Sequence, residues 1–143
     1  MTQIWKWTGP IALWAIVLVS VAHRPVLQAW QAGWIIPAGA ANERTPLTVT
    51  ETTRAAGKRL FDTRCARCHG PAGLGDGPDA NAKYRHDMDL TNPADAAENP
   101  DGVVFYKIWN GHGSPKMPAF SDSLNKAQAW TIVAYVQTLR PKG

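Results

Sequence analysis

Cysteine is scarce in this chain of 143 residues, and its scarcity excludes several kinds of protein. Two cysteines are too few for the disulfide framework of a small secreted domain, a four-cysteine zinc site or an iron–sulfur cluster held by four thiolates. Charged residues, at 18 %, and hydrophobic residues, at 45 %, are typical of globular proteins, which excludes disorder along the whole chain. The length suits one compact domain with an extension.

Clusters of basic residues are also lacking. The first 36 residues hold no acidic side chain and only two basic ones, Lys6 and Arg24. In the rest of the chain basic and acidic residues are nearly balanced and alternate in sign, as they do from Glu51 to Arg64. A nucleic-acid-binding protein would gather Lys and Arg on one face or along one helix. We therefore expect no nucleic-acid partner.

The N-terminal stretch has few charges and a long apolar run. The segment from Ile4 to Ala22 has 19 residues, close to the roughly 20 that cross a bilayer core as a helix. Trp5 and Trp7 near its start, and His23 and Arg24 after its end, are typical of anchors at the membrane surface. We predict that residues 1–36 form one transmembrane helix followed by a segment that lies at the membrane surface.

A cleaved secretory signal is the alternative interpretation of this stretch. Lys6 would be its basic start and Ile11–Val21 its apolar core, with cleavage after Ser20–Ala22 or Ala38–Ala40. Cleavage would leave a soluble protein. Under either interpretation the chain is sent out of the cytoplasm.

The remainder divides into a linker and a folded domain. Residues 37–48 contain two prolines and many small residues without periodicity, which predicts a linker. Residues 49–143 show no strand-like alternation, so we predict an all-α domain. Two capping patterns mark helix starts in it: Thr48 with Glu51, and Asn125 with Gln128. The second is followed by apolar residues at helical spacing as far as Leu139.

Both cysteines belong to one motif, Cys65-Ala-Arg-Cys68-His69. Two thiols three residues apart can form thioethers with the two vinyl groups of one haem, and the following histidine then reaches the iron. A thioredoxin-like pair would need a preceding strand, and a zinc site would need a second pair of ligands at metal spacing. The sequence has neither pattern, so we infer one covalently attached haem c.

Met117 is predicted as the second axial ligand of the iron. It lies in the stretch Gly111–Phe120, where Pro115 and Pro118 stiffen a backbone too rich in Gly and Pro to be helical. A thioether is a soft, neutral ligand that favours ferrous iron and raises the potential. The sequence leaves three alternatives open for this position: His86, Met88 and His112.

From about Thr50 to Leu139 the chain resembles a class I c-type cytochrome of the small bacterial kind. The matching motifs are Gly57–Phe61, Cys65–Pro78, Asp89–Thr91, Asp101-Gly102 with Gly111, Lys116–Phe120 and Trp130–Val136. The resemblance implies a cytochrome c fold of three to five helices around the haem, with iron bound by His69 and Met117. It also implies that the first and last helices cross near Gly57 and Tyr135.

Further contacts with the haem are expected from the same resemblance and from burial preferences. The carbonyl of Pro78, or alternatively of Pro71, is implied to accept a hydrogen bond from the ring of His69. The residues expected against the macrocycle are Leu90, Ile108, Trp109 and Phe120, and those expected to bind the propionates are Tyr84, Arg85 and Trp109. Ordinary core or surface contacts are the alternative for each of these.

An iron whose axial positions are both occupied by the protein has no vacancy for oxygen or substrate, so it can only exchange electrons. We predict an electron carrier rather than an enzyme, anchored in the bacterial inner membrane. Its haem domain would face the periplasm, because this kind of haem attachment occurs outside the cytoplasm in the family. The expected donor is a quinol-oxidising or dehydrogenase complex, and the expected acceptor is an oxidase, another cytochrome or a photosynthetic reaction centre.

Three alternatives remain for the function. The protein could be a haem enzyme or gas sensor in which Met117 dissociates from the iron. It could be a soluble periplasmic cytochrome c after signal cleavage. It could also be a subunit whose N-terminal helix chiefly holds a larger oxidoreductase complex together.

Overall fold

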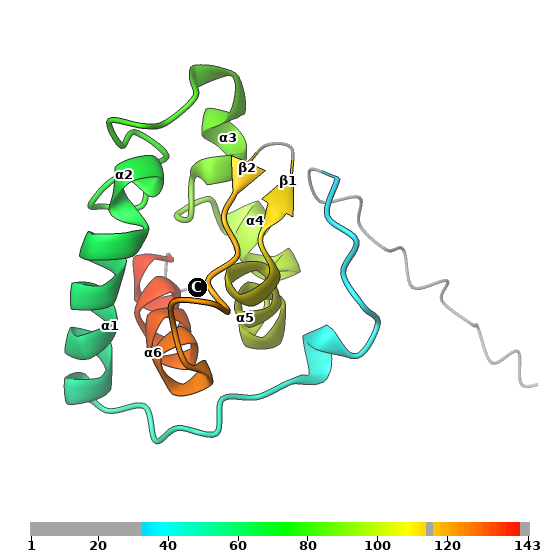
Figure 1. The fold of residues 1–143 in the computed structure, drawn as a ribbon, viewed down its shortest axis with the longest axis vertical. Helices are drawn as coiled ribbons and strands as arrows, with labels where there is room; N and C mark the ends of the chain where they lie inside the picture. Colours follow the sequence, from blue (N-terminus) through cyan, green and yellow to red (C-terminus); the bar gives the residue numbers. More distant parts are fainter. Residues whose placement is uncertain (1–32, 114–115, 141–143) are drawn as a thin grey trace, which may run out of the picture.

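Helices form nearly all the regular structure in the computed structural model, which describes residues 33–113 and 116–140 (Figure 1). They are α1 (Glu51–Arg64), α2 (Ala66–His69), α3 (Arg85–Met88), α4 (Pro93–Glu98), α5 (Asp101–Asn110) and α6 (Lys126–Val136). Short 3-10 turns are η1 (Ala40–Asn42), η2 (Ala82–Tyr84) and η3 (Gln137–Leu139). Two short strands, β1 (His112–Gly113) and β2 (Lys116–Met117), pair antiparallel. The prediction of a mainly helical domain is therefore confirmed, whereas the short β1–β2 pair differs from the expected absence of strands.

Helix α1 begins two residues later than the first capping pattern would place it. Its cap is Thr50, whose side chain accepts a hydrogen bond from the Thr53 N–H, and Thr53 Oγ1 accepts one from the Thr50 N–H in return. The pairing of Thr48 with Glu51 was therefore wrong. The second residue of this capping box is Thr53, whose hydroxyl also donates to the Thr48 carbonyl at 2.9 Å. The cap predicted for α6, Asn125 with Gln128, is confirmed.

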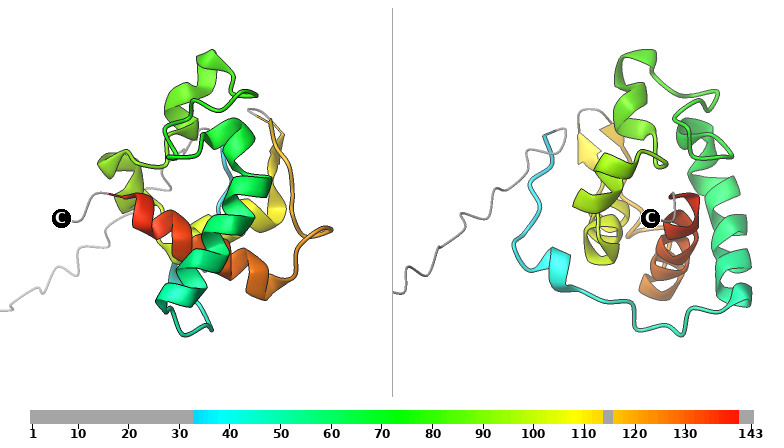
Figure 2. Two further views of the ribbon diagram at one scale, coloured as in Figure 1. Left: turned by 90° about the vertical axis from the view of Figure 1, so that its left-hand side faces the viewer. Right: turned by 180° about the vertical axis from the view of Figure 1, so that it is seen from behind.

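Helices α1 and α6 cross at Gly57, as expected, and the left view of Figure 2 shows the crossing. A Cβ at Gly57 would collide with the carbonyl oxygen of Thr131 and with the Tyr135 side chain. One turn further along α1, Phe61 is completely buried, with its ring 5.2 Å from that of Tyr135. The absence of a side chain at position 57 is what allows the two backbones to approach closely.

Gly57→Ala should therefore destabilise the haem-loaded protein. Overpacking at a close helix contact costs about 2–3 kcal/mol, more than the gain in helix propensity from Gly to Ala. Denaturant unfolding measures the difference in free energy. Gly39→Ala is the matched control, since Gly39 has a right-handed φ of −77° and no atom within 4 Å of an added Cβ. Equal stabilities of the two variants would contradict the close contact at Gly57.

The N-terminal part of the described chain lies along the domain. Within residues 33–113 and 116–140 there is no helix long and apolar enough to cross a membrane. The predicted transmembrane helix, Ile4–Ala22, lies outside these residues. In the predicted linker, Ala40 is only 5 % exposed, and Gly102 of α5 leaves room for its carbonyl. Because this contact holds Ala40 against α5, fewer residues of the predicted linker, 37–48, are left to act as a spacer.

Candidate functional site

A cavity of about 320 Å³ lies among α1, α5, α6 and the loops that connect them. Its apolar wall includes Phe61, Val104, Ile108, Ile132 and Val136, and its rim is polar and charged. The full set of lining residues is Trp34, Phe61, Cys65, His69, His86, Asp87, Asp89, Leu90, Asp95, Ala96, Glu98, Asn99, Val104, Lys107, Ile108, Met117, Ile132, Val136 and Arg140. The predicted site residues Cys65, His69, Leu90, Ile108 and Met117 are thus brought together.

The cysteine motif folds as a single helical turn at the end of α1. Cys65 ends α1 and begins α2, and its carbonyl accepts hydrogen bonds from the N–H groups of Cys68 and His69 at 3.1 and 2.9 Å. This turn places Cys65 and His69 on the cavity wall, with Cys68 partly buried beside them. Burial raises the pKa of the Cys65 thiol to about 12. The Cys65 thiol is therefore at the cavity wall, and Cys68 follows within the same helical turn.

The imidazole of His69 has a fixed orientation. Its Nδ1 donates a hydrogen bond of 2.8 Å to the backbone carbonyl of Met88, which leaves Nε2 with its lone pair. Burial lowers the pKa of this ring, so it is neutral at physiological pH, as a metal ligand must be. A carbonyl partner on the other nitrogen is the usual way that a protein orients such a ligand and strengthens it as a donor.

The partner of His69 corrects the expectation of a carbonyl at Pro78 or Pro71. Both prolines are exposed. The glycine-rich loop after His69 folds against the segment that follows α3, where the Leu90 N–H donates to the Gly73 carbonyl at 2.7 Å. This pairing brings the Met88 carbonyl to the ring.

Pro78 is held in a different place. The next residue, Asp79, donates its N–H to the Arg67 carbonyl at 2.7 Å, and its carboxylate pairs with the Arg67 guanidinium at 2.6 Å. These contacts hold the chain at Pro78 beside α2, at the protein surface. Because any residue can present a carbonyl, side-chain motifs could not distinguish Met88 from the prolines.

Met117 reaches the cavity from β2. In the strand pair it lies opposite His112, and the turn between α5 and β1 is made by Gly111, with a left-handed φ of 65°. A side chain at Gly111 would collide with the backbone of Met117 and Ala119. The loop thus passes close to the end of α5 and directs Met117 to the wall that His69 also lines.

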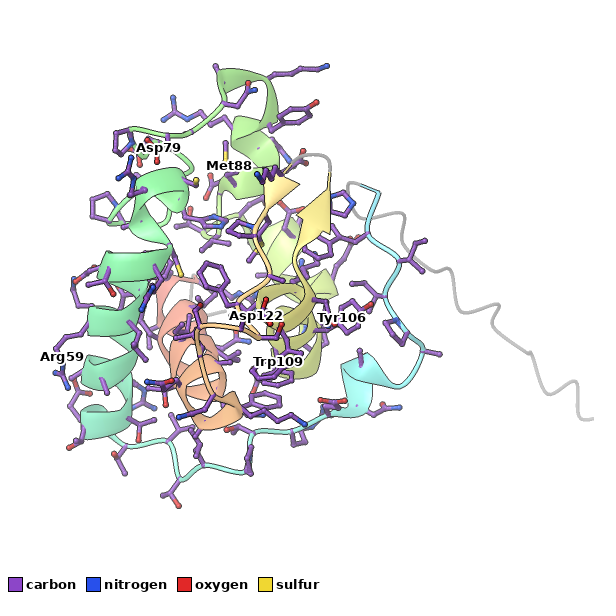
Figure 3. All side chains as sticks on the ribbon, in the orientation of Figure 1. Arg59, Asp79, Met88, Tyr106, Trp109 and Asp122 are labelled. Atoms are coloured by element: carbon purple, nitrogen blue, oxygen red, sulfur yellow. The ribbon has the colours of Figure 1, made fainter. Side chains whose placement is uncertain are left out.

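The other candidates for the sixth position are less well placed. The cavity lining does not include Met88, which is the last residue of α3 and contributes its carbonyl to His69 (Figure 3). His112 is not in the lining either, and its ring stacks on Trp34. His86 does line the cavity, but its side chain is 75 % exposed. Among the described residues, Met117 is the best-placed partner for His69.

Four other residues expected at the haem lie outside the cavity lining. Trp109 and Phe120 do not line the cavity, and neither do Tyr84 and Arg85. Trp109 stacks on Phe105, with ring centroids 5.7 Å apart, well away from Met88 in Figure 3. Successive residues of a helix point about 100° apart, so with Ile108 facing the cavity, Trp109 faces away.

Phe120 acts through its backbone instead. Its N–H donates to the carbonyl of Ile108 at 3.1 Å, which ties the loop after Met117 to the end of α5. Tyr84 and Arg85 lie where η2 meets α3. Their polar tips and nearby sequence motifs were compatible with a propionate site, but the chain between α2 and α4 folds so that they are outside the cavity.

Two cationic side chains at the cavity were missed by the sequence reasoning. Lys107 of α5 donates from Nζ to Asn99 Oδ1 at 2.6 Å. Burial lowers its pKa to about 8. The signal that could have identified it is a single lysine within the otherwise apolar run Val103–Trp109.

Arg140 is the second of these cations. One end of its guanidinium, Nη1, donates to the carbonyls of Ala96 and Asn99 and to Gln137 Oε1, at 2.6–3.2 Å. Its Nε is buried without a hydrogen-bond partner among the described residues. A buried donor without an acceptor is costly, so this edge of the cavity suits an anionic group.

The donor set fits a haem. The thiol of Cys65, the imidazole of His69 and the thioether of Met117 line the cavity together with apolar side chains. Lys107 and Arg140 belong to the same lining and could bind the carboxylates of a haem. The described residues contain no cluster of three or more His, Cys, Asp and Glu side chains that could hold a metal ion. An iron bound by His69 and Met117 would therefore need a porphyrin for its remaining ligands.

Comparisons with known proteins agree with this fit. The family model for cytochrome c matches residues 54–140, nearly the range of the resemblance seen in the sequence. No curated protein matches the chain. Among solved structures, a chain of the reducing HAO-like protein complex of Kuenenia stuttgartiensis is 30 % identical, with a TM-score of 0.59. The match covers 68 % of this chain and 48 % of that one, so this chain spans about half of its relative's length.

Proposed function

Because the chain belongs to the cytochrome c family and so carries covalently bound haem c, we propose that it relays single electrons through an iron held by His69 and Met117. One observation supports this best. His69 presents an unprotonated Nε2, oriented by the Met88 carbonyl, to a cavity whose wall also includes Met117. Held by His69 and Met117, a bound haem would supply an iron that exchanges one electron and has no position free for a substrate.

The chain would attach the haem covalently, orient the iron ligands and exclude water from the cavity. Cys65 and Cys68 would hold the macrocycle through thioethers, and Leu90 and Ile108 would pack against it. The wall behind them is rigid, since Phe61, like Ile132 and Val133 of α6, is completely buried. A dry, close-packed wall keeps the ligand geometry nearly the same in both oxidation states.

Lys107 and Arg140 are proposed to bind the propionates in place of Tyr84, Arg85 and Trp109. Arg140 and Lys107 both belong to the cavity lining, and a carboxylate could satisfy the buried Nε of Arg140. Trp109 lies outside the lining, which favours Lys107 and Arg140 for this role.

Lys107 should make the midpoint potential depend on pH. Burial lowers its pKa to about 8, the carboxylates of Asp87, Asp95 and Glu98 partly oppose this shift, and Arg140 adds to it. A positive charge near the iron disfavours the ferric state. The potential should therefore fall, on the order of 50 mV, as pH rises and the ammonium loses its proton.

Redox titration across about pH 6 to 10 tests this prediction with Lys107→Met as the comparison. The variant should have a lower potential at the acidic end and a flatter curve. A haem propionate bound to the Lys107 ammonium would raise the pKa of this lysine. The fall in midpoint potential would then occur at higher pH. Identical curves for the two proteins would remove Lys107 from the haem environment.

The proposed setting of the protein is a membrane-bound electron-transfer complex. The solved relative is a chain of a protein complex, which favours protein partners for this chain as well. With residues 1–36 as a membrane anchor and the domain in the periplasm, the search for a partner would be tethered rather than free. The proposed donor is a quinol-oxidising or dehydrogenase complex, and the proposed acceptor is an oxidase, another cytochrome or a reaction centre.

Carbon monoxide discriminates an electron carrier from a haem enzyme or gas sensor. The ferrous holoprotein should show no spectral change under carbon monoxide, and its redox titration should follow a one-electron curve. Rapid formation of a carbon monoxide complex at neutral pH would instead show an open distal position. Isolation from native membranes in mild detergent would identify the partners.

A further inference from the structure

Trp34 lines the cavity although it lies twenty residues before the range matched by the cytochrome c family. The sequence placed it in a segment at the membrane surface, but in the structure it packs on the domain. Its indole stacks on the imidazole of His112, with centroids 4.6 Å apart and planes inclined by 26°. The ammonium of Lys107 lies 5.3 Å from the centre of the same indole.

A backbone contact beside Trp34 reinforces the stack. His112 Nε2 donates to the carbonyl of Gly33 at 3.1 Å. Residues 33 and 34 are therefore joined to the domain by a hydrogen bond, a ring stack and a cation–π contact. All three contacts are made with two residues, Lys107 near the end of α5 and His112 at the start of β1.

These contacts lead directly to Met117. His112 is the residue opposite Met117 in the β1–β2 pair, and each strand has only two residues. An isolated pair of strands is marginally stable in water, and two residues a strand is far below the usual length. The segment that carries Met117 therefore depends on packing from outside the hairpin, and on the β1 side the Trp34 ring supplies it.

We propose that Trp34 is a positioning residue for the axial methionine: its ring braces His112 and thereby holds the Met117 hairpin against the haem cavity. The proposal rests on the proposed function, in which Met117 is the sixth ligand. In this proposal Trp34, a residue outside the range matched by the family, determines how often Met117 dissociates from the iron. The cavity is complete on its methionine side only with this N-terminal segment in place.

The test compares full-length haem-loaded protein with Trp34→Ala and Trp34→Phe. The readouts are the affinity of ferric protein for imidazole, which competes with methionine, and the far-red absorption band of methionine-ligated ferric haem. Trp34→Ala should bind imidazole about tenfold more tightly, the factor that corresponds to about 1.4 kcal/mol of lost ring contacts. Trp34→Phe keeps an aromatic ring and should be close to the unaltered protein.

Trp109→Ala is the matched control. This tryptophan is also partly buried and stacked, on Phe105, but it does not line the cavity. It should lower stability and leave imidazole affinity unchanged. Far-ultraviolet circular dichroism verifies that each variant is folded.

Two results separate this proposal from the proposed function. If Met117→Ala loses the far-red band while Trp34→Ala matches the unaltered protein in imidazole affinity, the ligand assignment stands and the bracing role is wrong. If the unaltered protein lacks the band and Met117→Ala changes nothing, Met117 is not the ligand and both proposals fall. Equal effects of Trp34→Ala and Trp109→Ala would also overturn the bracing role.

Discussion

Replacing Cys65 and Cys68 together by alanine should abolish covalent haem and nearly all folded protein. The cavity at the centre of the domain has a volume of about 320 Å³. At about 24 cal/mol for each Å³ of unfilled interior, leaving it empty would cost about 8 kcal/mol. This is comparable with the whole stability of a typical domain, about 5–15 kcal/mol. The two thioethers keep the group that fills this space from dissociating.

Acid–acetone extraction followed by a pyridine haemochrome assay measures the effect. In the double variant any remaining haem should pass into the organic phase, whereas in the unaltered protein it stays with the polypeptide. Arg67→Ala is the matched control inside the same motif, because the Arg67 side chain is 74 % exposed and forms its ion pair with Asp79 at the protein surface. It should retain covalent haem. Covalent haem in the double variant would refute the role assigned to the cysteines.

The parts of the site that the sequence predicted are those that local chemistry determines. The spacing of Cys65, Cys68 and His69 fixes one helical turn whatever the rest of the fold does. Two prolines and glycines around Met117 exclude a helix there. For Leu90 and Ile108, family motifs and burial preferences pointed to the same face that the structure shows lining the cavity.

The parts that it missed depend on contacts between distant segments. The acceptor for His69 is a backbone carbonyl, at Met88, and a carbonyl leaves no mark on the residue type. Trp109 follows Ile108 directly on α5, and the helix rotation of one residue takes its ring from the cavity lining to a stack on Phe105. Arg140 reaches the cavity only after α6 has packed against α1 and brought η3 beside α4, where its guanidinium meets the Ala96 and Asn99 carbonyls.

Met117→Ala should lower the midpoint potential and open the iron to added ligands. Loss of the thioether removes the ligand that favours ferrous iron, so water or a stronger donor would take its place. The expected fall is on the order of 0.2 V, a sizeable part of the roughly 0.8 V range that axial ligands cover. Spectroelectrochemical titration measures it, and carbon monoxide binding to the ferrous form reports the open position.

Met88→Leu is the control that makes this result specific. Met88 acts through its backbone carbonyl, which accepts the hydrogen bond from His69, and its side chain is not part of the cavity lining. Leucine keeps that carbonyl, so potential and spectrum should both be preserved. If the far-red band disappeared in Met88→Leu and persisted in Met117→Ala, the sulfur on the iron would be that of Met88. The His69 carbonyl contact would then have to be made by another residue, since one short segment could not supply a ligand to each face of the haem.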